Sequence, residues 1–181
     1  MLLLKRVRLA RKGSIFMQVV SIVGKSDNGK TTLIEGLVKE LKKRGYRVAT
    51  IKHNIHGFEI DKKGKDSYRH KEAGADTAVI SSPKKLAFVK EIKKELTIDQ
   101  IAKFYLSDMD IILTEGYKRE NKPKIEVFRQ EAGHKEPLCS DGEDLIALVT
   151  NCNLIGAPNV PSFAMDDVCG VVNFLEEKYF K

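Results

Sequence analysis

Two repeating patterns of hydrophobic and polar residues along the chain predict its secondary structure. Short apolar runs rich in β-branched residues are typical of buried strands, and apolar residues spaced three and four apart are typical of helices. The first pattern predicts strands at 19–23, 47–51, 77–81, 86–89, 110–114, 124–128 and 145–150. The second predicts helices after residue 32, at 66–73, at 98–106 and from 168, the last capped by Asp166 or Asp167. Strands alternating with helices predict an α/β fold with a mostly parallel sheet and helices on both faces.

The first predicted strand runs directly into a glycine-containing loop and then into a helix. Residues 24–32, GKSDNGKTT, contain the spacing G-x-x-x-x-G-K-[ST] of a phosphate-binding loop. Gly24 and Gly29 permit the tight turn that directs backbone N–H groups at phosphate oxygens, and the start of the helix adds partial positive charge. The motif therefore predicts a P-loop NTPase-type, doubly wound fold. A solvated strand-to-helix turn is the alternative, which both flanking elements disfavour.

Most positions of this loop have an expected contact with a nucleotide. The ammonium of Lys30 is expected at the outer phosphates, and the hydroxyl of Thr31 is the expected ligand of a Mg²⁺ ion shared with them. The predicted nucleotide contacts are Gly24, Asn28, Gly29, Lys30, Thr31 and Thr32. Lys25 is a catalytic candidate that would reach the nucleotide of a second subunit. Its alternative is a simple exposed lysine in a polar loop.

A metal ion bound by Thr31 needs an acidic group from a second strand. The predicted strand at 110–114 ends in Glu115, and Gly116 then allows a tight turn. Glu115 is therefore the expected second metal contact and a catalytic candidate, with a plain surface carboxylate as the alternative. Asp110 opens the same strand at the wrong end, so we expect it to have a strand-start or capping role.

The polar segment 52–70 leaves the carboxyl end of the second predicted strand, the edge where doubly wound sheets bind ligands. The candidate substrate or anion contacts in this segment are Lys52, His53, Asp66 and Arg69. Asp61 is a catalytic candidate, and both Asp61 and Asp66 are alternative metal contacts. Three of the four histidines fall here, but without a third ligand at fixed spacing they give little support to a zinc site.

The charge of the chain is concentrated at its N-terminus. The 181 residues carry a formal net charge of +7, but five basic residues and no acidic one lie within 5–12, so the rest carries only +2. We expect residues 1–16 to be a disordered or non-native basic extension and residues 17–181 to be one P-loop domain. A membrane-surface or nucleic-acid-binding arm is the alternative for the extension, while nucleic-acid binding is not expected of the domain.

Other compositional features favour an intracellular protein. No apolar run approaches the ~20 residues that a membrane span requires. The cysteines, Cys139, Cys152 and Cys169, are odd in number and show no paired spacing, so neither a disulfide framework nor a zinc cluster is expected. The expected location is the cytoplasm.

Four elements taken together resemble the MobB family, the accessory GTP-binding proteins of molybdopterin-guanine dinucleotide biosynthesis. They are the loop at 24–33, Ile51-Lys52-His53 with His56, the segment 66–75 and Thr114-Glu115-Gly116-Tyr117-Lys118. The resemblance covers nearly all of 17–181. It implies a homodimer that binds GTP with Mg²⁺, hydrolyses it slowly at most, and assists the guanylyltransferase that joins GMP to molybdopterin, with molybdopterin as a candidate further ligand. By residue match, Lys30 and Thr31 contact phosphate and magnesium, and Glu115 lies near the metal.

The preference for guanine rests on this resemblance alone. The strand at 145–150 is followed by Asn151-Cys152-Asn153-Leu154, which holds only part of the Asn-Lys-x-Asp motif of the best-known guanine-specific GTPases. ATP is therefore an alternative ligand, and a small-molecule kinase or ATP-dependent ligase is the alternative function. A kinase would turn over on the order of 1 to 100 times per second with its acceptor. No arginine finger or catalytic glutamine has a role that the sequence fixes, so at most a slow Mg²⁺-dependent GTPase is expected.

Overall fold

The computed structural model describes residues 17–134, 136–139, 144–153 and 158–181. Its contacts divide the chain into two compact units. The first, here called the loop unit, comprises the chain up to His53 together with Tyr105–Lys181, and the second, the hairpin unit, comprises Asn54–Phe104. The basic extension expected at 1–16 lies outside the described residues.

The loop unit is built on one six-stranded sheet. Its strands are β1 (Gln18–Val23), β2 (Val48–Lys52), β5 (Ile111–Glu115), β6 (Lys124–Phe128), β7 (Leu145–Thr150) and β8 (Ser162–Phe163). They lie in the order β2-β5-β1-β6-β7-β8, and each neighbouring pair is parallel. This arrangement confirms the predicted P-loop type of α/β fold. The strand β8 is not among the predicted strands, because two residues are too few to establish a period.

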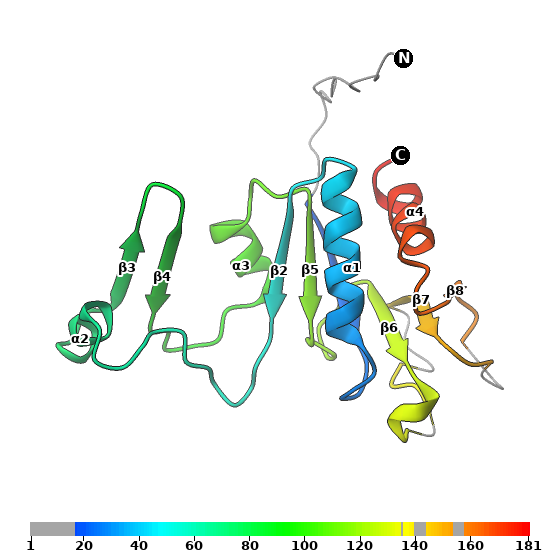
Figure 1. Cartoon of the computed structure of the whole chain (residues 1–181), viewed down its shortest axis with the longest axis horizontal. Helices are drawn as coiled ribbons and strands as arrows, with labels where there is room; N and C mark the ends of the chain where they lie inside the picture. The colour runs from blue at the N-terminus through cyan, green and yellow to red at the C-terminus, as the bar shows by residue number, and fades with distance from the viewer. Residues whose placement is uncertain (1–16, 135, 140–143, 154–157) are drawn as a thin grey trace, which may run out of the picture. The chain divides into compact units, whose positions relative to one another are not determined.

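Two helices of this unit, α1 (Lys30–Lys43) and α4 (Val168–Tyr179), pack against one another and against the sheet. Figure 1 shows α1 crossing in front of the strands with α4 beside it. Alternate residues of each strand face these helices, so Val20 and Ile22 of β1 join Leu37 and Leu41 of α1 in a core that excludes water. No helix in the described ranges has the length and apolar character needed to span a membrane.

Parallel pairing brings the carboxyl ends of the strands to a single edge of the sheet. The arrowheads of β2, β5 and β6 all reach this edge in Figure 1. The loop that follows β1, the Glu115-Gly116 turn of β5 and Arg129 after β6 therefore share the edge where α/β proteins bind ligands. Asp110 lies at the opposite end of β5, where its buried carboxylate accepts the backbone N–H of Arg47 and pairs with that guanidinium. This agrees with the predicted strand-start role.

The hairpin unit contains α2 (Asp66–Glu72), β3 (Thr77–Ser81), β4 (Leu86–Lys90) and nearly all of α3 (Ile98–Tyr105). The prediction that these two strands belong to the main sheet is wrong. Among the described residues they pair only with each other, antiparallel, with Val79 opposite Phe88. The link at 82–85 contains Pro83 and is too short for the crossover that parallel strands need.

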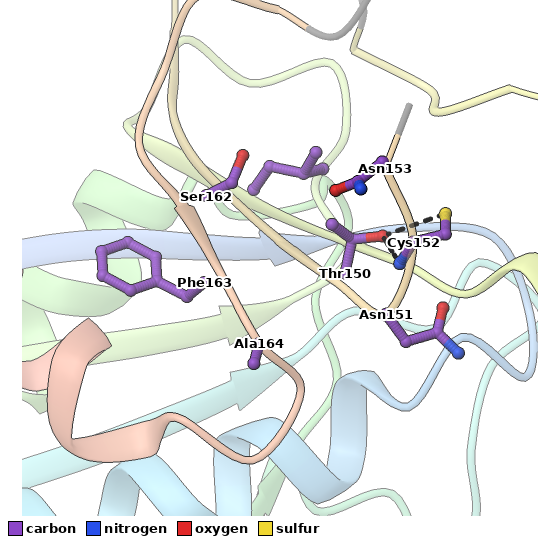
Figure 2. A pocket seen from close by; sticks show the side chains of 8 residues that line it. Thr150, Asn151, Cys152, Asn153, Ser162, Phe163 and Ala164 are labelled. Atoms are coloured by element: carbon purple, nitrogen blue, oxygen red, sulfur yellow. Dashed lines mark hydrogen bonds between the residues drawn. The ribbon is translucent and has the colours of Figure 1, made fainter. Parts of the chain in front are cut away.

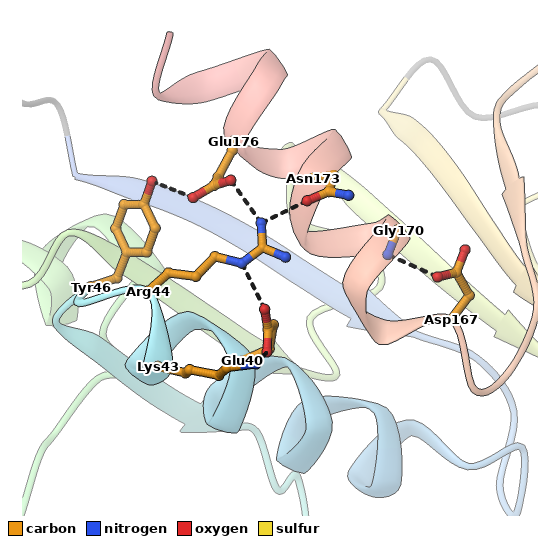
Figure 3. Close-up of polar contacts among 8 residues, drawn as sticks. All are labelled: Glu40, Lys43, Arg44, Tyr46, Asp167, Gly170, Asn173 and Glu176. Atoms are coloured by element: carbon orange, nitrogen blue, oxygen red, sulfur yellow. Dashed lines mark hydrogen bonds and ion pairs between the residues drawn. The ribbon is translucent and has the colours of Figure 1, made fainter. Parts of the chain in front are cut away.

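A polar network joins the end of α1 to α4 (Figure 3). The Arg44 guanidinium donates to Glu40 within α1 at 2.8 Å, and to Asn173 and Glu176 of α4 at 2.7 Å each. The hydroxyl of Tyr46 donates to the other carboxylate oxygen of Glu176. Because α1, the segment that follows it and α4 share these partly buried charges, the network fixes how α4 sits on α1.

Arg44→Ala should lower the free energy of unfolding by about 1–2 kcal/mol, because it leaves carboxylates without their shared donor. Lys42→Ala, an exposed lysine of the same helix, is the matched control and should change it little. The Arg44 hydrogen bond also lowers the pKa of Glu40 below its ordinary value, so this contribution is present above the ordinary pKa and lost as pH falls through the lower folded pKa. Urea unfolding at neutral and acidic pH measures both effects, and equal stabilities of the two variants at neutral pH would contradict the assignment.

Candidate nucleotide-binding site

The loop after β1 has the backbone conformation that its glycines predict. Gly24 and Gly29 have φ angles of 145° and 91°, in the region that favours glycine. A Cβ atom at Gly24 would lie 2.5 Å from the carbonyl oxygen of Val127, so no larger residue fits there without a shift of the backbone. The loop is thus held closely against the end of β6.

Asn28 fastens the middle of the loop and leaves one polar group without an acceptor. Its side chain is 1% exposed, and its Oδ1 accepts the backbone N–H of Arg129 at 3.1 Å. Its Nδ2 is buried and has no hydrogen-bond partner among the described residues. Buried donors are almost always paired, so this atom fits a loop whose ligand supplies acceptor oxygens.

The start of α1 adds positive charge to the loop. Gly29 precedes the helix without a side-chain cap, and the first turn holds no acidic residue. The ammonium of Lys30 donates to the carbonyl oxygen of Lys25 at 2.7 Å. Burial lowers the pKa of Lys30, while the charge of Glu115 acts in the opposite direction. An anionic ligand would stabilise both the ammonium and the uncapped helix terminus.

Glu115 meets the loop from the neighbouring strand, as the sequence predicts. The hydroxyl of Thr31 donates to Oε2 of Glu115 at 3.3 Å, and the ammonium of Lys52 lies 3.6 Å from Oε1. A hydroxyl beside a carboxylate is an oxygen donor set of the kind that Mg²⁺ prefers. No group of three or more His, Cys, Asp or Glu side chains suited to a metal occurs in the described part of the chain, so the pair fits an ion that takes its other ligands from phosphates.

His53 lies beside the turn that follows Glu115. Its backbone N–H donates to the carbonyl of Glu115 at 3.0 Å, and its ring stacks on Tyr117 with 4.4 Å between centroids. Gly116 and Tyr117 have φ angles of 100° and 52°, and a Cβ atom at Gly116 would lie 3.3 Å from that of His53. The tight turn therefore depends on the glycine and positions Tyr117 against His53.

Other predicted residues lie in different settings. The ammonium of Lys25 donates to the carbonyl oxygen of Glu136 at 3.0 Å within the same chain, and Thr32 is exposed. Asp61, Asp66 and Arg69 belong to the hairpin unit. There Asp61 accepts the Ser67 hydroxyl at 2.9 Å, with its second oxygen buried and unpaired among the described residues, whereas Asp66 and Arg69 are exposed and 3.9 Å apart.

Two residues that lie beside the loop are not among the predicted site residues. A Cβ atom at Gly29 would lie 3.2 Å from Cε of Met165 and 3.7 Å from Cδ of Arg129. Ligands of α/β proteins bind at the carboxyl ends of the strands, and this rule led to Glu115 after β5. Arg129 follows the end of β6, so the same rule also applied to Arg129. Met165 carried no usable signal, because it follows the unpredicted strand β8.

Comparisons with known proteins agree with this geometry. A family model described as MobB, molybdopterin guanine dinucleotide synthesis protein B, matches residues 19–151. A molybdopterin-guanine dinucleotide biosynthesis adapter protein of Haemophilus influenzae is 40% identical over 134 residues, 74% of each chain. One of Escherichia coli K12 is 33% identical over 168 residues, covering 91% of this chain and 95% of the relative.

A solved structure supports the same relationship. The crystal structure titled molybdopterin-guanine biosynthesis protein B superposes with a TM-score of 0.70 at 31% identity, covering 90% of this chain and 99% of that one. The family model spans the loop at 24–32, Glu115 and the hairpin unit, so the match covers the candidate site as well as most of the sheet. The chain belongs to the MobB family.

Proposed function

We propose that this chain binds GTP with Mg²⁺ at the loop after β1 and acts in the cytoplasm as an accessory protein to a molybdopterin guanylyltransferase. The observation that carries the proposal is the anion-seeking loop, in which Lys30 and the unpaired donor of Asn28 lie beside the Thr31–Glu115 pair. The choice of GTP and of the partner enzyme rests on the names of the relatives, which are adapter proteins of molybdopterin-guanine dinucleotide biosynthesis.

In this proposal each side chain at the sheet edge has a distinct task. Backbone N–H groups of 24–32 and the Lys30 ammonium bind the phosphates, while Thr31 and Glu115 hold the metal ion. Lys52, 3.6 Å from Glu115, supplies a further cation near the outer phosphates. The bound Mg²⁺ would neutralise phosphate charge. Hydrolysis is slow in this proposal, because the sequence fixes no arginine or glutamine in the charge-stabilising role that accelerates phosphoryl transfer by roughly 10³ to 10⁵.

We further propose that the functional form is a homodimer and that the hairpin unit takes part in its interface. The hairpin exposes several large apolar side chains, namely Val79, Ile80, Leu86 and Phe88. Val79 and Phe88 lie opposite each other across the two strands, at 60% and 45% exposure. Exposed apolar side chains that lie side by side, as Val79 and Phe88 do, are typical of protein interfaces, and a second copy of the chain is the occupant that the family resemblance implies.

Phe88→Glu should convert the dimer to a monomer, because a charge at an apolar interface must be desolvated without a partner. Lys84→Glu changes an exposed residue of the same hairpin turn and should leave the dimer intact. Sedimentation velocity at micromolar concentration measures the mass of each. A monomeric parent, or a Phe88→Glu variant that stays dimeric, would contradict this part of the proposal.

The nucleotide proposal is tested by calorimetric titration of the parent protein with GTP, GDP and ATP, each with and without Mg²⁺. We expect GTP to bind more tightly than ATP and its binding to strengthen with Mg²⁺. A preference for ATP, together with turnover on the order of 1 to 100 per second on a small acceptor, would replace the accessory role with that of a kinase.

A further inference from the structure

We infer that Glu126 is a positioning residue for the phosphate-binding loop, and that its carboxylate acts through the segment 136–139 and the side chain of Lys25. This inference rests on the proposed nucleotide binding at that loop. Glu126 lies in β6 and is 1% exposed. Its strand neighbours Ile125 and Val127 belong to the core that includes α1 and α4, so the Glu126 side chain faces the other side of the sheet.

Both carboxylate oxygens of Glu126 accept hydrogen bonds from one short segment of the chain. The backbone N–H of Leu138 donates to Oε1, and that of Cys139 donates to Oε2 at 2.8 Å. Lys124, the buried cation two residues earlier in β6, pairs instead with Asp144 at 2.9 Å. A buried carboxylate is costly unless hydrogen bonds or a cation compensate it. Glu126 therefore depends on these two N–H groups, and in turn it fixes the segment that carries them.

The same segment holds the phosphate-binding loop. The ammonium of Lys25 donates to the carbonyl oxygen of Glu136 at 3.0 Å, and Glu136 lies two residues before Leu138. The carbonyl oxygen of Lys25 accepts the Lys30 ammonium at 2.7 Å. A series of hydrogen bonds joined by short stretches of chain therefore leads from the buried carboxylate of Glu126 to the lysine expected at the outer phosphates.

The chain that leaves β6 is held at its beginning by other contacts. Arg129 directly follows β6, and its backbone N–H donates to Asn28 of the loop at 3.1 Å. The Asn151 amide extends away from β8 in Figure 2, and its Oδ1 accepts the backbone N–H of Gln130 at 3.3 Å. If the later segment 136–139 were released from its carboxylate, this beginning would stay attached and the hold on the loop lysine would be lost.

A fixed Lys25 prepares the loop for a ligand. Gly24 already packs against the end of β6, so the link to Glu136 fixes the next residue, whose carbonyl positions the Lys30 ammonium. A loop that is ordered before binding loses less entropy when a phosphate binds, so its affinity is higher. Glu126→Gln should break this link at its origin. An amide has one acceptor oxygen and a nitrogen that donates, so it cannot accept both backbone N–H groups.

The test is a double-mutant cycle of Glu126→Gln and Lys25→Ala, with the affinity for Mg²⁺–GTP measured by calorimetry. With Lys25 present, Glu126→Gln should weaken binding about three- to tenfold. In the Lys25→Ala background the link to Glu136 is already gone, so the same substitution should change the affinity by less than about twofold. Glu136→Gln changes an exposed side chain of the segment and keeps its carbonyl oxygen, so it should match the parent.

A second measurement follows the link without any nucleotide. Hydrogen exchange of the Leu138 and Cys139 amides should be at least about threefold faster in nucleotide-free Lys25→Ala than in the parent, because coupling between two sites is reciprocal. This variant changes a side chain whose hydrogen bond is exposed, so it should fold even if Glu126→Gln does not. Lys39→Ala removes an exposed lysine from α1 and should exchange like the parent.

The possible results separate this inference from the proposal it rests on. A parent that does not bind GTP would refute nucleotide binding at the loop. Equal weakening of GTP binding by Glu126→Gln with and without Lys25 would refute the positioning role and leave the loop assignment intact, because Glu126 would then act on the fold alone. Unchanged exchange of both amides in Lys25→Ala would refute the link itself, whether or not the parent binds GTP.

Discussion

Lys30→Ala should weaken Mg²⁺–GTP binding by at least about a hundredfold, because a hydrogen bond to a charged group is worth about 1.5–3 kcal/mol and a phosphate-binding lysine makes more than one. The ammonium lies at the first residue of α1, where the uncapped helix terminus also faces the loop. Its contact in the chain itself is the carbonyl of Lys25, so its removal should change the free energy of unfolding by less than about 1 kcal/mol.

Lys39→Ala is the matched control for this experiment. Lys39 is an exposed lysine of the same helix, so the substitution removes one positive charge from α1 without touching the loop. GTP titration and thermal unfolding of both variants separate loss of the ligand from loss of the fold. Parent-like GTP affinity in a folded Lys30→Ala protein would refute the assignment of the loop.

Glu115→Gln should act mainly on the metal ion. The substitution keeps the size of the side chain but removes the charge that lies 3.3 Å from the Thr31 hydroxyl. We expect the ratio of GTP affinity with Mg²⁺ to GTP affinity without Mg²⁺ to fall roughly 10- to 100-fold. This range is typical for loss of a group that orders a metal site. Hydrolysis should slow at least as much, whereas GTP binding without Mg²⁺ should stay the same or strengthen, because a negative charge near the phosphates has gone.

The control is Glu35→Gln on the exposed face of α1. Magnesium titrations at fixed GTP, followed by single-turnover hydrolysis, measure the two effects. If GTP binding by Glu115→Gln depends on magnesium as strongly as in the parent, Glu115 is not the metal contact, and the contact is reassigned to Asp61 or Asp66. Each of these can be examined with the same pair of measurements.

Much of the loop unit was predictable from local patterns. The strand at Lys124–Phe128 and the one at Leu145–Thr150 have the predicted bounds, because each concentrates apolar and β-branched residues in a short run. The phosphate-binding loop and Glu115 were found by motif and by the rule that ligands bind at the carboxyl ends of strands. The structure places the Thr31 hydroxyl 3.3 Å from the Glu115 carboxylate.

The remainder depended on contacts between distant residues. The two strands of the hairpin have the same sequence pattern as strands of the main sheet. Only the short link at 82–85 indicates that they pair antiparallel with each other. Met165 reaches Gly29 because β8 returns the chain to the sheet edge, and a two-residue strand leaves no pattern. The partner of Lys25, a carbonyl oxygen 111 residues away, is likewise set by the fold and by no local signal.

The central claim is tested most directly by reconstituting cofactor guanylation with purified guanylyltransferase, molybdopterin and limiting GTP. Three reactions are compared, with the parent protein, with Lys30→Ala and with neither. The account predicts that the parent raises the yield of guanylated cofactor and that Lys30→Ala does not, because the adapter would act through its bound nucleotide. Equal yields in all three reactions, or an equal gain from Lys30→Ala and the parent, would contradict it.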